Sequence, residues 1–87
     1  MKEAMLNRPV TIAVIDDNVE FAIGIKLMLA KDGVDTHTAG DGVEGLTLVR
    51  RLLPDIVLLD VVMPGMSGLE VKLAAWTTTL SNLIWEM

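Results

Sequence analysis

The 87-residue sequence contains no cysteine and few aromatic residues. Without thiols the chain can form no disulfide, thiol nucleophile or zinc–thiolate site, and this composition is typical of a reducing compartment. Aromatic residues make up 3% of the chain, whereas hydrophobic residues make up 52%. The core is therefore expected to be aliphatic and methionine-rich, and the length leaves room for a single domain.

Basic residues and long apolar runs are also scarce. Lys and Arg number 7 against 12 Asp and Glu, which gives a net charge of −5. This negative charge disfavours nonspecific binding to the phosphate backbone of nucleic acids, so no direct nucleic-acid contact is expected. No apolar run reaches the roughly 18 residues of a membrane span, and residues 1–9 lack the apolar segment of a signal peptide. We therefore expect a soluble, cytoplasmic chain that makes no membrane contact.

Strand-like and helix-like patterns alternate from residue 10 onward. Apolar runs at 10–15 and 56–59 and an alternating run at 34–39 predict three strands, of which 34–39 is peripheral. Apolar residues at helical spacing predict helices over 18–31 and between Gly42 and Pro54. Such alternation is typical of βαβ units, so the predicted fold class is α/β, a doubly wound parallel sheet covered by helices.

The last third of the chain predicts a long helix. Ser67 and Glu70 have the spacing of a capping box, which marks a helix start. A seam of apolar residues then recurs at intervals of three and four up to the last residue. Its members are Leu69, Leu73, Trp76, Leu80, Leu83 and Met87. Against this helix stand Thr77, Thr78 and Thr79, because β-branched residues favour extended structure.

Carboxylates follow two of the predicted strands. Asp60 comes directly after the apolar run 56–59 and before a loop that contains Pro64 and two glycines, and Asp16 and Asp17 follow the run 10–15. In a doubly wound sheet of strand order 2-1-3, the strands 10–15 and 56–59 are neighbours. Ligand sites of such sheets form at the carboxyl ends of the strands, where the strand order reverses. We therefore expect these three aspartates to converge.

Three converging carboxylates repel one another unless a cation lies among them. Magnesium suits this role because it is a hard ion that prefers oxygen ligands and takes few carboxylates together with phosphate oxygens. A carboxylate beside bound magnesium is a plausible nucleophile toward phosphorus, and Asp60 would then form an aspartyl phosphate. The glycines of the loop after Asp60 allow close approach of backbone, and the carbonyl of Val62 is a candidate fourth ligand.

Structural roles compete with these assignments. Asp17 could be the N-cap of the following helix, with Glu20 completing a capping box. Its pairing with Asp16 and the matching position of Asp60 favour the site instead. For Asp41, three residues before Glu44, we prefer the capping role.

Together these motifs resemble the receiver domain of bacterial two-component response regulators. The residues that carry the resemblance are Asp16-Asp17, Asp60, the loop Met63-Pro64-Gly65-Met66-Ser67-Gly68 and Ala39-Gly40-Asp41-Gly42. It implies a flavodoxin-like fold and a signalling role that is not enzymatic. A sensor histidine kinase or phosphotransfer protein would phosphorylate Asp60 in the presence of Mg²⁺. Asp17 would bind the ion directly, Asp16 through water, and the Val62 carbonyl would be a further ligand.

The chain departs from the pattern of that family after its third βα unit. Receivers carry a Ser or Thr after a fourth strand and a Lys after a fifth, and both contact the phosphoryl group. Thr77 to Thr79 follow no buried apolar run, and none of the four lysines, Lys2, Lys26, Lys31 and Lys72, ends a predicted strand. We therefore expect an N-terminal tail at 1–9, a partial receiver domain at 10–72 and a helical extension at 73–87.

An incomplete sheet of three strands would leave the strand 56–59 as an exposed apolar edge. Such edges pair with other chains unless they are protected. A homo-oligomer through this edge and the C-terminal helix is therefore expected. An alternative function follows, in which the chain is a truncated receiver that no longer switches and only oligomerises or binds a partner. A magnesium-dependent phosphatase is disfavoured, because Val62 stands two residues after Asp60, where an acid/base Asp would be needed.

Overall fold

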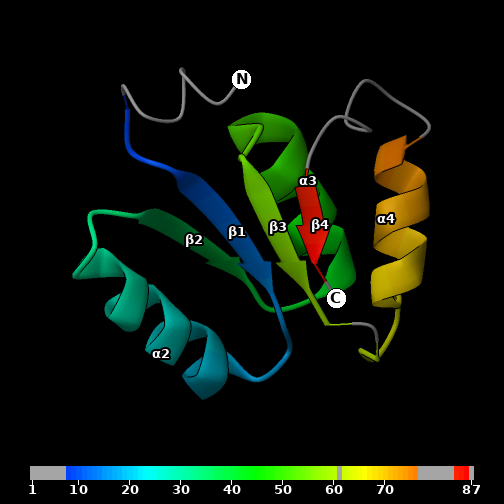
Figure 1. Ribbon diagram of the computed structural model, residues 1–87. Coiled ribbons are helices and arrows are strands. Elements are labelled where there is room, and N and C mark those ends of the chain that lie inside the picture. The colour runs from blue at the N-terminus through cyan, green and yellow to red at the C-terminus, as the bar shows by residue number, and fades with distance from the viewer. Residues whose placement is uncertain (1–7, 61, 77–83, 87) are drawn as a thin grey trace.

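The computed structural model describes residues 8–60, 62–76 and 84–86. Strands and helices alternate along the chain as predicted (Figure 1). In chain order the elements are β1 (Thr11–Ile15), α2 (Val19–Ala30), β2 (Asp35–Ala39), α3 (Gly42–Leu52), β3 (Ile56–Leu59), α4 (Gly68–Trp76) and β4 (Ile84–Glu86). The strands form one sheet in the order β2-β1-β3-β4, and every pairing is parallel.

Helices lie on both faces of this sheet. On one face, α3 and α4 cover Ala13 and Ile15 of β1 and Val57 and Leu59 of β3, which form the larger apolar core. On the other face, α2 packs over alternate residues of the same strands in a smaller core that includes Val14. Because side chains of a strand alternate between faces, both of these central strands carry apolar side chains toward both faces.

Local hydrogen bonds set the helix starts. The side chain of Asn18 accepts a hydrogen bond from the Phe21 amide (3.0 Å) and caps α2. The alternative that Asp17 is the N-cap is therefore wrong: the chain enters α2 one residue later, and the Asp17 carboxylate does not serve this helix. The preferred capping role of Asp41 is confirmed, since its Oδ1 accepts from the Glu44 amide at 2.8 Å.

The capping box before α4 is also present. The Ser67 hydroxyl accepts from the Glu70 amide and the Glu70 carboxylate accepts from the Ser67 amide, both at 3.3 Å. The two reciprocal bonds satisfy amides that the first turn of a helix leaves unpaired.

The prediction of one helix that runs to Met87 is wrong. Residues Ile84–Glu86 form a strand, and β4 pairs in parallel with β3, with Ile56 opposite Ile84 and Leu58 opposite Glu86. For the same reason β3 is not the exposed edge that was expected. Without β4, one side of β3 would present unpaired amides and carbonyls. Pairing with these groups stabilises a strand at Ile84–Glu86 more than the heptad-like pattern stabilises a helix, because three β-branched residues weaken that helix. Leu80, Leu83 and Thr77 to Thr79 lie outside the described residues.

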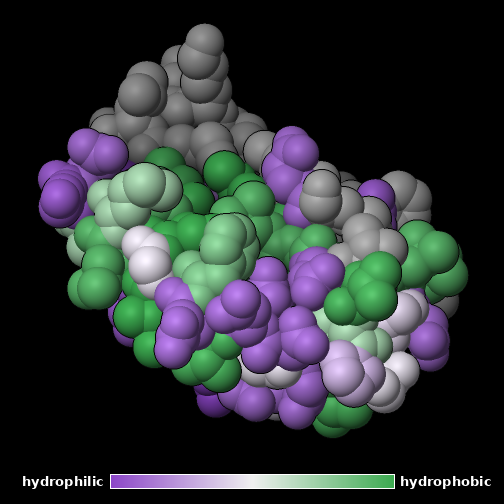
Figure 2. Space-filling view, turned by 90° about the horizontal axis from the view of Figure 1, so that it is seen from below, coloured by the Kyte–Doolittle hydropathy of each residue, from purple (hydrophilic) through white to green (hydrophobic). Residues whose placement is uncertain are grey.

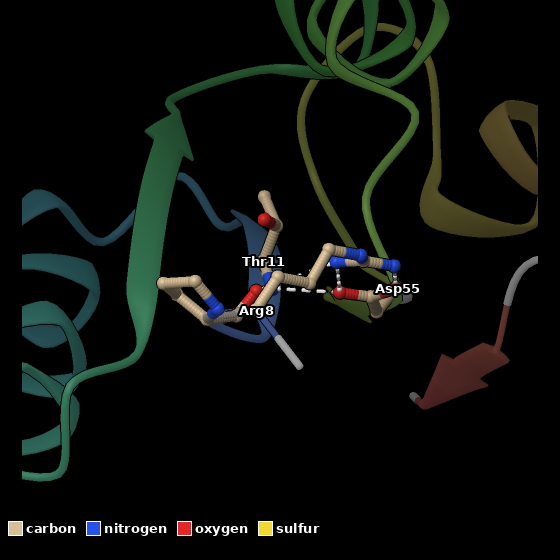
Figure 3. Close-up of polar contacts among 4 residues, drawn as sticks. Arg8, Thr11 and Asp55 are labelled. Atoms are coloured by element: carbon tan, nitrogen blue, oxygen red, sulfur yellow. Dashed lines mark hydrogen bonds and ion pairs between the residues drawn. The ribbon is translucent and has the colours of Figure 1, made fainter. Parts of the chain in front are cut away.

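A paired arginine and aspartate join the amino ends of β1 and β3 (Figure 3). The Arg8 guanidinium donates through Nη1 and Nη2 to the two carboxylate oxygens of Asp55, at 2.8 and 2.6 Å. The Thr11 amide donates to the same carboxylate at 2.8 Å, and the Asp55 side chain is only 7% exposed. The hydrogen bond from Arg8 is the main reason that the pKa of Asp55 is lowered, with a further contribution from the Thr11 amide against the opposing effect of burial.

No helix within residues 8–60, 62–76 and 84–86 combines the length and the apolar character that a membrane crossing requires.

Candidate functional site

The carboxyl ends of β1 and β3 lie side by side. Ile15 and Leu59 are register partners, and the pairing continues one step further because the Asp60 amide donates to the Ile15 carbonyl at 2.9 Å. On the other side of β1, the Asp16 amide donates to the Ala39 carbonyl of β2 at 3.1 Å. The two sequence-separated aspartates therefore leave the sheet at the same edge.

The structure brings the three predicted aspartates together. Asp16, Asp17 and Asp60 each offer a carboxylate oxygen, and these oxygens lie within 4.8 Å of one another. Asp16 and Asp60 are half-buried, and Asp17 is exposed. Figure 2 looks onto the molecule from this side, and hydrophilic residues gather in the middle of the view with hydrophobic residues on either side.

Backbone amides orient two of the three carboxylates. Oδ1 of Asp16 accepts from the Asn18 amide at 2.9 Å, and Oδ1 of Asp60 accepts from the Val62 amide at 3.1 Å. Each bond spans two residues and closes a small turn at the end of its strand. Val62 lies beside the site, because its amide donates to the Asp60 carboxylate. Ligation by the Val62 carbonyl stays a prediction.

The electrostatics of the cluster favour a cation. The pKa of Asp17 is raised, first by desolvation, then by the charge of Asp60 and a hydrogen bond with it, and then by the charge of Asp16. The neighbouring carboxylates thus disfavour the ionised form of Asp17. A divalent ion with oxygen preference would remove this repulsion, and three carboxylates match the hard donor set that magnesium takes.

Two glycines shape the surroundings of the site; sequence reasoning named Gly42 only as part of the entry to a helix and missed Gly45. A Cβ on Gly42, at the start of α3, would lie 2.5 Å from the Met66 carbonyl oxygen in the loop that follows Asp60. A Cβ on Gly45 would lie 2.6 Å from the side chain of Ile15, which is the residue before Asp16. The available signal was the presence of glycine inside a predicted helix, which often marks close packing.

Other polar residues for which no role in the site was predicted are distributed as follows. Lys26 and Lys72 lie within α2 and α4, and Lys31 follows α2 directly. Lys2 and Thr77 to Thr79 lie outside the described residues. His37 lies on the edge strand β2, half-buried, with Nε2 at 3.1 Å from an Asp35 oxygen.

Comparison with known proteins identifies the family. The sequence model of the response regulator receiver domain matches residues 12–75, which include all three aspartates of the cluster. The chain belongs to this family. Receiver domains of two-component response regulators are signalling domains, and the resemblance predicted from the motifs is confirmed.

Curated relatives agree with this assignment. Over 60 residues the chain is 47% identical to the DNA-binding response regulator MtrA of Mycobacterium leprae, a match that covers 69% of this chain and 27% of the relative. It is 44% identical over 64 residues to the probable transcriptional regulatory protein TcrX of Mycobacterium tuberculosis, covering 74% of this receiver chain and 27% of TcrX. The chain thus corresponds to about a quarter of the length of these relatives.

Solved structures show the same fold. The N-terminal domain of a response regulator receiver protein from Methanoculleus marisnigri is 33% identical, with a TM-score of 0.76, and the match covers 83% of this chain and 58% of that one. The chemotaxis protein CheY4 of Vibrio cholerae is 26% identical with a TM-score of 0.77, covering 83% and 60%. The predicted flavodoxin-like parallel sheet with the order 2-1-3 is therefore confirmed.

Proposed function

We propose that this receiver chain accepts a phosphoryl group on Asp60 in a magnesium-dependent reaction. The donor is a phosphohistidine of a sensor histidine kinase or phosphotransfer protein in the cytoplasm. The observation that carries the proposal is the meeting of three carboxylates within 4.8 Å at the carboxyl ends of two adjacent parallel strands. Of the three, Asp60 is the one that leads from β3 into the loop that contains Gly65 and Gly68.

Asp60 supplies the nucleophile. One of its carboxylate oxygens attacks phosphorus, the phosphorus–nitrogen bond of the donor breaks, and the electron pair of that bond stays on the imidazole nitrogen. The Val62 amide holds Oδ1 of Asp60, and the Ile15 carbonyl holds the Asp60 amide, so both the side chain and the backbone of the nucleophile are fixed before reaction.

Asp16, Asp17, Asp60 and the Val62 carbonyl would hold the metal ion. When bound, magnesium neutralises the carboxylates and the charge on the phosphoryl oxygens. Asp16 is suited to its role because the Asn18 amide restrains its carboxylate at the end of β1. Asp17, which caps no helix, has its carboxylate available to the site.

Intact-mass measurement after incubation with Mg²⁺ and a small phosphodonor such as acetyl phosphate tests the proposal. We expect a single phosphoryl adduct that hydroxylamine removes, as an acyl phosphate requires, and that Asp60→Asn abolishes. Asp55→Asn is the matched control, because Asp55 stands at the opposite end of the same strand and bonds Arg8; this variant should retain the adduct.

The alternative function, a non-switching module that only binds partners, predicts neither an adduct nor magnesium binding. Isothermal titration calorimetry with MgCl₂ separates the two functions without relying on phosphorylation. Absence of both signals from a folded wild-type chain would overturn the phosphoacceptor proposal. The designation of a relative as DNA-binding belongs to that longer protein, and no DNA contact is proposed for this chain.

A further inference from the structure

Helix α2 carries apolar side chains around almost its whole circumference. Glu20 and Lys26 are its only charged residues, and the other ten are apolar or glycine. A helix with this composition is normally buried on all sides. In this structure five of its large apolar side chains are between 47% and 65% exposed, namely Val19, Phe21, Ile23, Leu27 and Met28.

Helical periodicity sorts most apolar positions of α2 into three stripes and leaves Val19 outside them, on the flank that carries Lys26. The inner stripe packs against the sheet of its own chain and consists of Ala22, Ile25 and Leu29. A flanking stripe consists of Phe21, Gly24 and Met28. The outer stripe, opposite the inner one, consists of Ile23 and Leu27. Only the inner stripe is covered by the described part of the chain.

An apolar groove of about 430 Å³ opens between α2 and the sheet. Its apolar lining includes Phe21 and Ile25 from α2 and Val14 and Leu58 from the two central strands. Glu86 of β4 and two of the site aspartates, Asp16 and Asp60, line it as well. In Figure 1, α2 lies toward the β2 side of the sheet, away from β4. Parallel strands are normally covered on both faces. The part of the sheet that lines the groove has no helix over it among the described residues.

We propose that this surface binds a second copy of the chain in a two-fold symmetric dimer, in which α2 of each copy lies in the groove of the other. In this arrangement the inner stripe contacts its own sheet, the flanking stripe contacts the second α2, and the outer stripe contacts the second sheet over β3. All three stripes are then covered. A lone helix from a different protein would fill the groove and leave Ile23 and Leu27 exposed.

The available area meets the lower limit for a specific interface. The exposed side chains of the flanking and outer stripes, Phe21, Ile23, Leu27 and Met28, together present on the order of 400 Å² of surface, within the range of the largest patches on monomers. With the open walls of the groove added, a symmetric pair of copies would bury on the order of 1,000 Å² in total, the least that a specific interface needs. Because the interface is isologous, each copy contributes both a helix and a groove.

Charge gives the dimer a distinctive salt dependence. Each copy carries a net charge of −5, and carboxylates of Asp16, Asp60 and Glu86 line the groove. Added salt screens the repulsion between like-charged copies, so dimerisation should strengthen as ionic strength rises. A basic partner peptide would show the opposite dependence.

Sedimentation velocity of the whole chain over roughly 1–100 µM tests the proposal. We expect a monomer–dimer equilibrium for the wild type. Leu27→Glu should raise the dissociation constant on the order of 100-fold, because it places an unpaired charge in an apolar interface. Leu27 is 65% exposed, so circular dichroism should show an unchanged fold.

Leu73→Glu is the matched control, since Leu73 is 58% exposed on α4. It should leave the dimer intact. A wild type that stays monomeric across this range would overturn the proposal. So would a dimer that Leu73→Glu disrupts and Leu27→Glu does not, because that result places the interface on the C-terminal helix that the sequence suggested.

The absence of cysteine allows a direct test of the geometry. Met28→Cys places the only thiol of the chain on the flanking stripe, next to the proposed two-fold axis. Oxidation should give a disulfide-linked dimer in high yield. Lys26→Cys, an exposed position on the opposite flank of the same helix, should stay monomeric under the same conditions. Equal cross-linking of both variants would contradict the proposed arrangement.

Discussion

The amide of Asp60 donates a hydrogen bond to the carbonyl of Ile15, 2.9 Å away, and this bond joins the two halves of the acidic site. Ile15 is completely buried and immediately precedes Asp16. Its side chain lies against Gly45 of α3, where no Cβ intervenes. The position of the proposed phosphoacceptor therefore depends on packing between the sheet and α3.

Gly45→Ala should destabilise the chain although alanine is the better helix former. The new Cβ would lie 2.6 Å from Ile15, whose side chain is enclosed and has little room to move. Overpacking costs about 1–3 kcal/mol, against a gain of about 0.5–1 kcal/mol from replacing a helical glycine. We expect a net loss of roughly 1 kcal/mol in the free energy of unfolding, measured by urea denaturation.

Gly24→Ala is the matched control for that substitution. A Cβ on Gly24, in the middle of α2, meets no atom within 4 Å. The helix propensity then acts alone and should raise stability by about 0.5–1 kcal/mol. Both glycine variants should be measured in the Leu27→Glu background, so that self-association does not affect the measured free energy of unfolding. Destabilisation of equal size in both would show that contact with Ile15 is not the cause.

Asp17→Asn should weaken magnesium binding and stabilise the metal-free chain. The substitution removes a carboxylate whose pKa is raised by desolvation and by the nearby Asp60 and Asp16. The loss of a ligand should raise the dissociation constant for Mg²⁺ by on the order of 10–100-fold in calorimetry. In the presence of a chelator, the midpoint of thermal unfolding should rise, because the like-charge repulsion has been reduced.

Glu20→Gln removes one negative charge from the nearby α2 surface and serves as the control for Asp17→Asn. It should change neither the magnesium affinity nor the metal-free midpoint to a comparable extent. Equal effects of both substitutions would indicate that net charge, and not the cluster, controls binding.

Asp41→Ala should reduce stability without affecting phosphorylation. The side chain of Asp41 caps α3 by accepting from the Glu44 amide at 2.8 Å, and loss of such a cap costs about 1 kcal/mol. Asp41→Asn retains a capping oxygen and should be nearly neutral. The yield of phosphoryl adduct should remain at the wild-type level in both variants. A loss of adduct in the folded Asp41→Asn chain would assign Asp41 to the site instead.

The pair of Arg8 and Asp55 should make stability fall in acid. Because the hydrogen bond from Arg8 lowers the pKa of Asp55 below its ordinary value of 3.8, the folded chain binds fewer protons there than the unfolded chain near that pH. The stabilisation is complete above the ordinary value and is lost as the pH falls through the lower folded pKa. Urea denaturation of wild type and Asp55→Asn should give a stability difference that is constant near pH 6 and shrinks toward pH 3.

The stability difference between wild type and Arg8→Gln should show most of the same pH dependence, because this substitution removes the main cause of the lowered pKa of Asp55. A difference between wild type and Asp55→Asn that grows as the pH falls would contradict the assignment. At neutral pH, Asp55→Ala should lower the free energy of unfolding more than Asp55→Asn does. It leaves the Thr11 amide without its acceptor, at a cost of about 1–3 kcal/mol.

Local patterns predicted much of the fold and failed where distant segments compete. The strand at Ile56–Leu59 and the capping box of Ser67 and Glu70 follow from neighbouring residues, and both are present. The N-cap of α2 required a choice among three adjacent polar residues, and Asn18 takes that role in place of Asp17. The segment Ile84–Glu86 could not be assigned from its own pattern, because its structure depends on the open edge of β3.

The sequence by itself determined the alternation of strands and helices and the placement of aspartates at the ends of two apolar runs. These features depend on side-chain periodicity and on turn residues within a few positions of one another. Only the tertiary structure decided that the oxygens of Asp16, Asp17 and Asp60 lie within 4.8 Å, that β4 pairs with β3, and that the described residues leave two stripes of α2 uncovered. Those outcomes depend on the register between strands and on which helix covers which face, and no local pattern of residues encodes either.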